Sequence, residues 1–211
     1  MIEYLLPILS AWFTMLIILD PLLSVSMFIN LTEHLSKAEV IRQAFIATAV
    51  AGVLMLSFLF FNDLVFDLLG IELESFKVAG GGILFILGLQ IVLGIDIGGS
   101  SAGHKSLASP DRVGKKAMAG VIIGTPIMCG PGAITTVMIL GAQEGLFITL
   151  TAVLLALVCI WLILVFSTVI KKLLGETVIV ILSKIMGLLL TAIAVHTIWT
   201  GILGLIALSV I

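Results

Sequence analysis

Charge is scarce in this sequence: only 10% of the 211 residues are Asp, Glu, Lys or Arg, whereas 61% are hydrophobic. Soluble domains carry about 25% charged and 45–50% apolar residues, so this composition cannot cover a globular protein with a water-compatible surface. We therefore predict an all-α integral membrane protein. A membrane barrel would show alternating segments of about ten residues instead of long apolar runs.

Other features that the sequence lacks narrow its function. Its two cysteines, Cys129 and Cys159, lie inside apolar runs, so we predict no disulfide framework. The segment Met1–Tyr4 has no basic signal-peptide region, so the first apolar run is expected to be retained. We find no nucleophile triad, metal-ligand cluster or nucleotide fingerprint, and therefore expect no enzyme, no metal and no cofactor beyond a coupling H+ or Na+. The formal net charge of −2 gives no sign of a nucleic-acid partner, and none is expected.

What the sequence has is a series of apolar runs long enough to cross a bilayer as helices. A spanning helix needs about 20 apolar residues. Between the second and third runs, residues 64–76 are amphipathic and predict an interfacial connection. Ser36 and Glu39 predict a capping box at the start of the second helix. The six predicted spans are 4–30, 40–62, 77–96, 117–142, 146–170 and 180–208.

The basic residues predict the orientation, because cytoplasmic loops are enriched in Lys and Arg. With six spans, one side of the membrane holds only Lys77. The opposite side, which we assign to the cytoplasm, holds Lys37, Arg42, Lys105, Arg112, Lys115, Lys116, Lys171, Lys172 and Lys184. We therefore expect a multi-pass protein of the plasma (inner) membrane with both termini extracytoplasmic.

An internal repeat is suggested by two alignments of the sequence with itself. Lys77 placed on Lys184 gives an offset of 107, and Pro21 placed on Pro131 gives an offset of 110. We interpret residues 1–97 as a first three-helix repeat, 98–116 as a cytoplasmic linker and 117–211 as a second repeat. Chance matching between apolar segments is the alternative. Three spans per half is an odd number, so the second half would be inverted, an arrangement typical of transporters with a site at the repeat interface.

Each half of the chain has a helix that we predict to be broken at a proline. The first break is Asp20-Pro21, and the second is Cys129-Gly130-Pro131-Gly132. Proline removes a backbone donor and disfavours helical geometry in the preceding residue. The exposed backbone groups are tolerated at membrane depth only where they line a cavity within the protein.

We predict that the two breaks form a substrate site. A helix that restarts after Pro21 or Pro131 directs its positive end at the cavity, where a carboxylate is favoured. Nearby hydroxyls are candidate substrate ligands. The alternative is an ordinary proline kink whose hydroxyls only satisfy the backbone. The candidate substrate-binding residues are Asp20, Pro21, Ser24, Ser26, Cys129, Gly130, Pro131, Gly132, Thr135 and Thr136.

Two titratable residues are candidates for ion or proton coupling. Asp20 has no Lys or Arg at similar depth, so we expect it to bind a substrate ammonium, carry a proton or hold a cation. A neutral Asp that satisfies local carbonyls is the alternative. His196 is a candidate proton carrier, with a hydrogen-bonded interior residue as the alternative. We interpret the glycines of the third and sixth runs as close-packing positions; they are Gly80, Gly81, Gly82, Gly88, Gly94, Gly187 and Gly201.

Several of these motifs together resemble the MarC family, whose members include the SnatA-type small neutral amino acid transporters. The shared motifs are Asp20-Pro21 with Phe28 and Leu31-Thr32, Gly80-Gly81, Pro126 with Gly130-Pro131-Gly132, and Met186-Gly187 with Gly201-Ile202. The resemblance covers nearly the whole chain. It implies a six-span plasma-membrane protein that transports small neutral amino acids such as glycine and alanine, driven by the electrochemical gradient. Many relatives have Gly and Pro where this chain has Leu23 and Ser26, which implies a milder first break.

Three other readings of the function stay open beside this one. The chain could be an exporter of another small solute, a non-transporting membrane assembly subunit, or an intramembrane enzyme, although an enzyme would need more deep polar residues. The expected partners are a small neutral amino acid and the lipid bilayer. A homo-oligomer is compatible with the sequence, which does not fix the oligomeric state.

Overall fold

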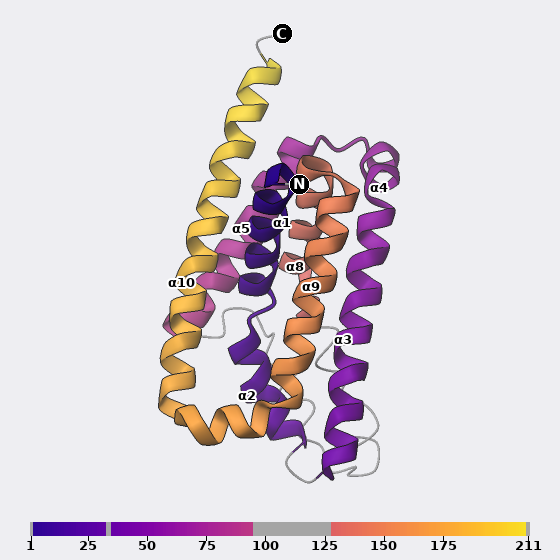
Figure 1. The fold of residues 1–211 in the computed structure, drawn as a ribbon. Coiled ribbons are helices and arrows are strands. Elements are labelled where there is room, and N and C mark those ends of the chain that lie inside the picture. The colour runs from indigo at the N-terminus through magenta and orange to yellow at the C-terminus, as the bar shows by residue number, and fades with distance from the viewer. Residues whose placement is uncertain (1, 33–34, 95–127, 210–211) are drawn as a thin grey trace.

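The computed structural model describes residues 2–32, 35–94 and 128–209, and within these ranges every regular element is an α-helix (Figure 1). The helices are α1 (Ile2–Ile18), α2 (Pro21–Thr32), α3 (Lys37–Phe60), α4 (Asn62–Leu69), α5 (Leu73–Leu93), α8 (Pro131–Glu144), α9 (Leu146–Val165) and α10 (Ser167–Ser209).

Five segments of the described chain are long and apolar enough to cross a membrane. They are Leu5–Ile29, Lys37–Phe60, Leu73–Leu93, Leu146–Val165 and Thr177–Leu208. These correspond to the predicted runs 4–30, 40–62, 77–96, 146–170 and 180–208. The predicted span 117–142 lies partly outside the described residues and is represented by α8, and the linker 98–116 lies wholly outside them. The prediction of an all-helical chain is therefore confirmed for the described residues, which contain five candidate membrane spans.

Helix boundaries differ from the sequence predictions where the chain changes direction. The predicted run 146–170 ends early, because α9 stops at Val165 and a new helix begins at Ser167. The predicted connection 64–76 contains most of α4 and the start of α5, with Gly70 between them in a left-handed conformation (φ 59°). Apolar periodicity alone does not place such short changes of direction, because only one or two polar residues mark them in the sequence.

The turn before α3 is built as predicted. Ser36 is the N-cap residue; its hydroxyl accepts from the Glu39 N–H (3.4 Å), and the Glu39 carboxylate accepts from the Ser36 N–H (2.8 Å). Two helix-end donors are thus satisfied by the two side chains, which confirms the capping box.

Two similar elbows connect long helices to short ones. Phe61, between α3 and α4, has φ −94° and ψ 14°, and Phe166, between α9 and α10, has φ −91° and ψ 9°. The short segments that follow end at Gly70 and at Gly175, both with positive φ. In Figure 1, α4 lies at the end of the bundle near the termini, whereas the first part of α10 lies at the opposite end.

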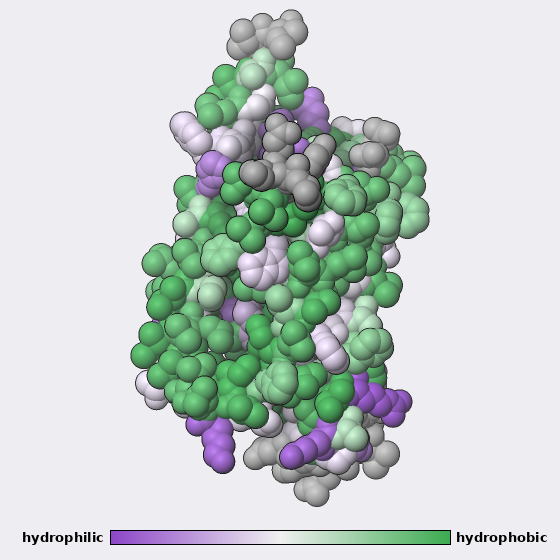
Figure 2. Space-filling model, viewed as in Figure 1, coloured by the Kyte–Doolittle hydropathy of each residue, from purple (hydrophilic) through white to green (hydrophobic). Residues whose placement is uncertain are grey.

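The surface has the polarity of a membrane protein. On the face shown in Figure 2, hydrophobic side chains cover the middle of the bundle and hydrophilic ones are concentrated toward its two ends. The start of α3, with Lys37, and the first part of α10, with Lys171 and Lys172, lie at the same end (Figure 1). Lys77 lies near the start of α5, toward the other end, where it pairs with Glu74 (Nζ–Oε1 2.9 Å).

Helices α5 and α10 pack closely against each other through glycine. A Cβ added at Gly88 would overlap the Thr191 side chain, and one added at Gly187 would lie 2.8 Å from the Ile91 Cβ. The close-packing interpretation is confirmed for Gly80, Gly81, Gly88, Gly187 and Gly201. It is wrong for Gly82 and Gly94, whose added Cβ would meet no described atom within 4 Å; Gly94 instead ends α5 with φ 66°.

Candidate functional site

The first predicted helix is broken at Asp20-Pro21, as its sequence indicated. Helix α1 ends at Ile18 and α2 begins at Pro21, which occupies the first helical position, where proline's missing N–H does no harm. Between them, Asp20 adopts a left-handed conformation (φ 38°), which is uncommon for any residue except glycine but enriched in Asp and Asn. The break is therefore a true change of backbone conformation at a buried position.

The carboxylate of Asp20 caps α2 and has capacity left over. Its Oδ1 accepts from the backbone N–H of Leu23 (3.1 Å), the geometry of an N-cap. Its Oδ2 is buried and has no hydrogen-bond partner among the described residues. Within the described residues, neither carboxylate oxygen is hydrogen-bonded to a backbone carbonyl. Among the described residues, one oxygen therefore caps the helix start and the other is buried without a hydrogen bond.

The second break, like the first, places a proline at the first position of the following helix, but it has no carboxylate. Gly130 is the N-cap of α8, Pro131 is its first residue, and the Gly130 carbonyl accepts from the N–H groups of Ala133 (3.0 Å) and Ile134 (3.2 Å). No side chain caps this helix start. Because Asp20 is matched by Gly130, only the first of the paired breaks carries a carboxyl group.

The four predicted hydroxyls all donate to backbone carbonyls of their own segment. Ser24 donates to Leu19 (3.2 Å) and Ser26 to Leu22 (3.1 Å). In α8, Thr135 donates to Pro131 (2.8 Å) and Thr136 to Gly132 (2.9 Å). Each hydroxyl has two acceptor lone pairs in addition to its donor, so these groups present acceptors, and not donors, to any ligand in this arrangement.

The predicted site residues differ in how accessible they are. Pro131 is exposed, and Ser26 and Gly130 are half-buried. The buried ones are Asp20, Pro21, Ser24, Cys129, Gly132, Thr135 and Thr136. Most of the predicted site is therefore inside the bundle. Both cysteines are free thiols, and Cys159 is half-buried in α9.

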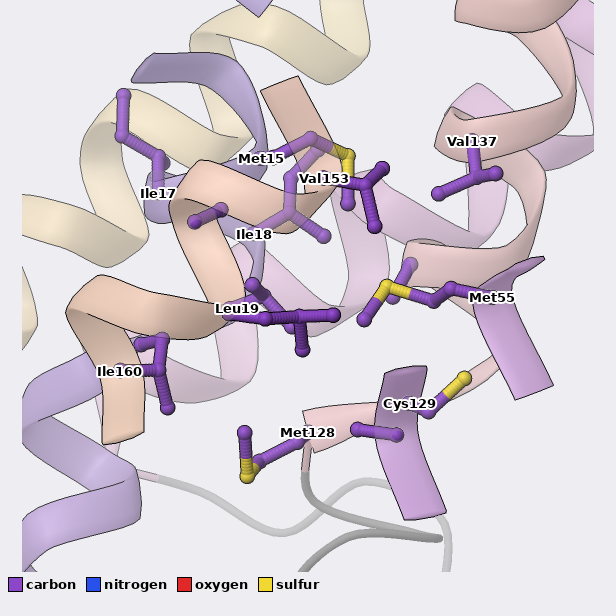
Figure 3. Close-up of a cluster of buried hydrophobic side chains, with 14 of the residues drawn as sticks. Met15, Ile17, Ile18, Leu19, Met55, Met128, Cys129, Val137, Val153 and Ile160 are labelled. Carbon is purple, nitrogen blue, oxygen red and sulfur yellow. The ribbon is translucent and has the colours of Figure 1, made fainter. Parts of the chain in front are cut away.

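Residues next to the two breaks belong to one buried cluster. Leu19, which precedes Asp20, and Met128 and Cys129, which precede the second break, are all buried in it. Figure 3 shows these side chains in one cluster, together with Met55 of α3 and Ile160 of α9. The residues that precede the two breaks therefore lie in one buried cluster.

His196 and Thr136 line the same groove on the helix bundle. It has a volume of about 380 Å³ and is lined by α1, α8 and α10. Five of its nine lining residues are polar: Thr14, Thr136, Gln143, His196 and Thr197. Sequence reasoning did not single out Thr14, Gln143 or Thr197 as site residues, because only the packing of α1, α8 and α10 brings them to one groove. His196 and Thr197 follow Ile193 by three and four residues, a helical spacing that places all three on one face of α10. This spacing was the only sequence signal for the groove.

The described part of the chain contains no group of three His, Cys, Asp or Glu side chains positioned to hold a metal ion. The chemistry that this arrangement can perform is recognition: a single carboxylate oxygen, backbone groups at two helix starts and several hydroxyl lone pairs. These groups suit a small polar solute or a monovalent cation.

Comparisons with known proteins agree with the family resemblance. The family model described as "MarC family integral membrane protein" matches residues 5–206. A UPF0056 membrane protein of Aquifex aeolicus is 32% identical over 201 residues, which cover 93% of this chain and 92% of the relative. A UPF0056 membrane protein of Methanocaldococcus jannaschii is 33% identical, covering 89% and 91%, and the Escherichia coli UPF0056 membrane protein YhcE is 28% identical, covering 89% and 88%. No solved structure matches the chain.

Proposed function

This chain belongs to the MarC family of integral membrane proteins, and we propose that it is a secondary active transporter of small neutral amino acids, of the glycine and alanine class, in the plasma membrane. The observation that carries the proposal is the break at Asp20-Pro21. A buried carboxylate at membrane depth is costly, and its Oδ2 has no partner among the described residues. An unused carboxylate oxygen beside a helix start is a binding group for an ammonium or a coupling cation.

The two breaks offer complementary groups to a zwitterion. The starts of α2 and α8 carry partial positive charge, which favours a carboxylate at the backbone N–H groups of their first turns. Asp20 and the carbonyls near Cys129 and Gly130 favour the ammonium. Because the surrounding side chains are closely packed and mainly apolar, only a substrate with a very small side chain suits the site.

We propose that the chain folds as two inverted three-helix repeats with both termini outside the cytoplasm. The similar elbows at Phe61 and Phe166 support this, since each is followed by a short helical segment that ends at a positive-φ glycine. The opposite placement of these segments in Figure 1 supports inversion. Labelling of single-cysteine variants at the start of α4 and at Lys171 with an impermeant thiol reagent tests it: opposite sides are expected, and reaction on the same side would contradict inversion.

The function is tested with purified protein in two steps. First, a thermal-stability screen across the amino acids, at two pH values and with or without sodium, identifies the ligand and coupling ion; stabilisation by glycine or alanine is expected. Second, proteoliposomes with an imposed gradient should accumulate that amino acid. Stabilisation by an unrelated solute would favour another transport class, and the absence of any ligand response would favour an assembly subunit.

A further inference from the structure

The groove beside Thr136 differs from the rest of the apolar bundle. Most of the exposed surface of the helices is hydrophobic, as expected for contact with lipid. The groove instead gathers five polar side chains from three helices. Polar groups that face lipid are unfavourable, so this concentration indicates a water-filled path.

The position of the groove connects the interior to one end of the bundle. Thr136 lies in the second turn of α8, close to the break at Pro131, and Gln143 lies one residue before the end of the helix. Seven residues of α-helix separate these two, a rise of about 10 Å. The end of α8 lies at the same end of the bundle as the described parts of both chain ends (Figure 1), which we assigned to the extracytoplasmic side.

The groups that line the groove are suited to a zwitterion, which carries one positive and one negative group and no net charge. The Thr136 and Thr197 hydroxyls donate to their own helices, at Gly132 (2.9 Å) and Ile193 (2.9 Å), so their lone pairs are the acceptors for an ammonium. Gln143 and His196 bring N–H donors for a carboxylate. No Asp, Glu, Lys or Arg is among the described residues that line the groove. A solute of net charge would find no counter-ion there.

We propose that this groove is an extracytoplasmic access site, which holds the zwitterionic amino acid before it reaches the two helix breaks. The inference rests on the proposed transport function. Its volume of about 380 Å³ is within the usual range of small-molecule sites, roughly 300–1,000 Å³, and leaves room for water beside a small amino acid. Binding here precedes the conformational change, so the groove governs affinity from one side of the membrane only.

The test compares two threonines one turn apart in α10. Thr197 lines the groove, whereas Thr200 does not and donates to the Thr197 carbonyl (3.0 Å). In proteoliposomes of known orientation, Thr197→Val should raise the half-saturation concentration for labelled glycine several-fold from the extracytoplasmic side. It should leave the value from the cytoplasmic side unchanged. Thr200→Val is the matched control and should change neither value.

A conservative variant separates binding from folding. Thr197→Ser keeps the hydroxyl and should restore the affinity that Thr197→Val loses, and the thermal-unfolding midpoints of all variants should be similar. Equal effects of Thr197→Val and Thr200→Val, or equal effects on both sides of the membrane, would overturn the access site while leaving the transport function intact. Wild-type proteoliposomes that carry neither glycine nor alanine would instead overturn the proposed function and the access site with it.

Discussion

Gly80 of α5 lies directly against Thr135 of α8, in the first turn after the second helix break. A Cβ built on Gly80 would overlap the Thr135 side-chain methyl. This contact holds α5 against the start of α8, and it continues at Gly132, where an added Cβ would lie 2.7 Å from a Leu84 methyl. The position of the second break therefore depends on the absence of a side chain at Gly80.

Gly80→Ala is expected to destabilise the protein, whereas Gly82→Ala is its matched control. The alanine methyl at position 80 must displace Thr135, and overpacking of this kind costs about 1–3 kcal/mol. At Gly82 an added Cβ meets no described atom within 4 Å, and alanine favours the helix by up to about 1 kcal/mol. Thermal unfolding in detergent measures both effects.

The same pair gives an internal check on that prediction. Thr135→Ser removes the methyl that overlaps the new Cβ but keeps the hydroxyl that donates to Pro131. Combined with Gly80→Ala, it should recover part of the lost stability. If the double variant is no more stable than Gly80→Ala alone, the overlap with Thr135 is not the cause of the destabilisation.

Substitutions at Asp20 should separate its backbone role from its charge. Asn tolerates the left-handed conformation and can still cap α2, so Asp20→Asn should fold almost normally yet lose gradient-driven uptake. Asp20→Gly keeps the conformation but loses the side-chain cap, at a cost of about a few tenths of a kcal/mol. Asp20→Ala loses the cap and adds left-handed strain, for a total of roughly 2–3 kcal/mol.

The measurements are thermal unfolding for the order Asn, Gly, Ala and proteoliposome uptake for function. The expected stability falls in that order, while uptake is lost already with Asn. Full uptake by Asp20→Asn would remove the charge from the mechanism and leave Asp20 as a helix cap.

Asn62 is expected to be important for the junction between α4 and α8. Its buried Nδ2 donates to the Met138 carbonyl (3.1 Å), across 76 residues of sequence. Asn62→Leu removes this hydrogen bond at similar side-chain volume and should cost about 1–2 kcal/mol. Ser57→Ala is the control, because the exposed Ser57 hydroxyl bonds only its own helix, at Val53. Equal unfolding midpoints for both variants would contradict a structural role for the Asn62 bond.

The Lys77–Glu74 pair should show coupling between its two members. Lys77 is buried, and the Glu74 carboxylate packs where a Cβ on Gly204 would lie 2.5 Å away. Lys77→Met leaves a partly buried carboxylate without its partner and should destabilise the protein by about 2 kcal/mol. The double variant Lys77→Met with Glu74→Gln should lose less. Additive losses in thermal unfolding would show that the two side chains do not stabilise each other.

The sequence predicted the helical spans and the first break because both have strong local causes. Apolar runs of about 20 residues determine helices in a membrane, and the proline at position 21 determines where α2 begins. The elbow at Phe166 was missed because its only local signal, the polar pair Ser167-Thr168, is short and is followed by further apolar residues. The non-packing role of Gly82 depends on which helix face meets α10, and one sequence does not reveal this.

The candidate site shows the same division. Local chemistry indicated Asp20 and Pro131, since an acid or a proline in an apolar run is unusual. The cap that Asp20 makes on α2, and the approach of His196 to Thr136 along one groove, depend on tertiary structure. Thr14 and Gln143 have meaning only through that groove.

The glycine contacts between α5 and α10 restrict how the molecule can move. The Gly88 carbonyl lies 3.1 Å from the position of a Cβ on Gly187, and the Thr191 side chain occupies the space of a Cβ on Gly88. Helix backbones that pack this closely cannot slide past each other without steric collision. This helix pair is therefore expected to move as one unit in the proposed transport cycle.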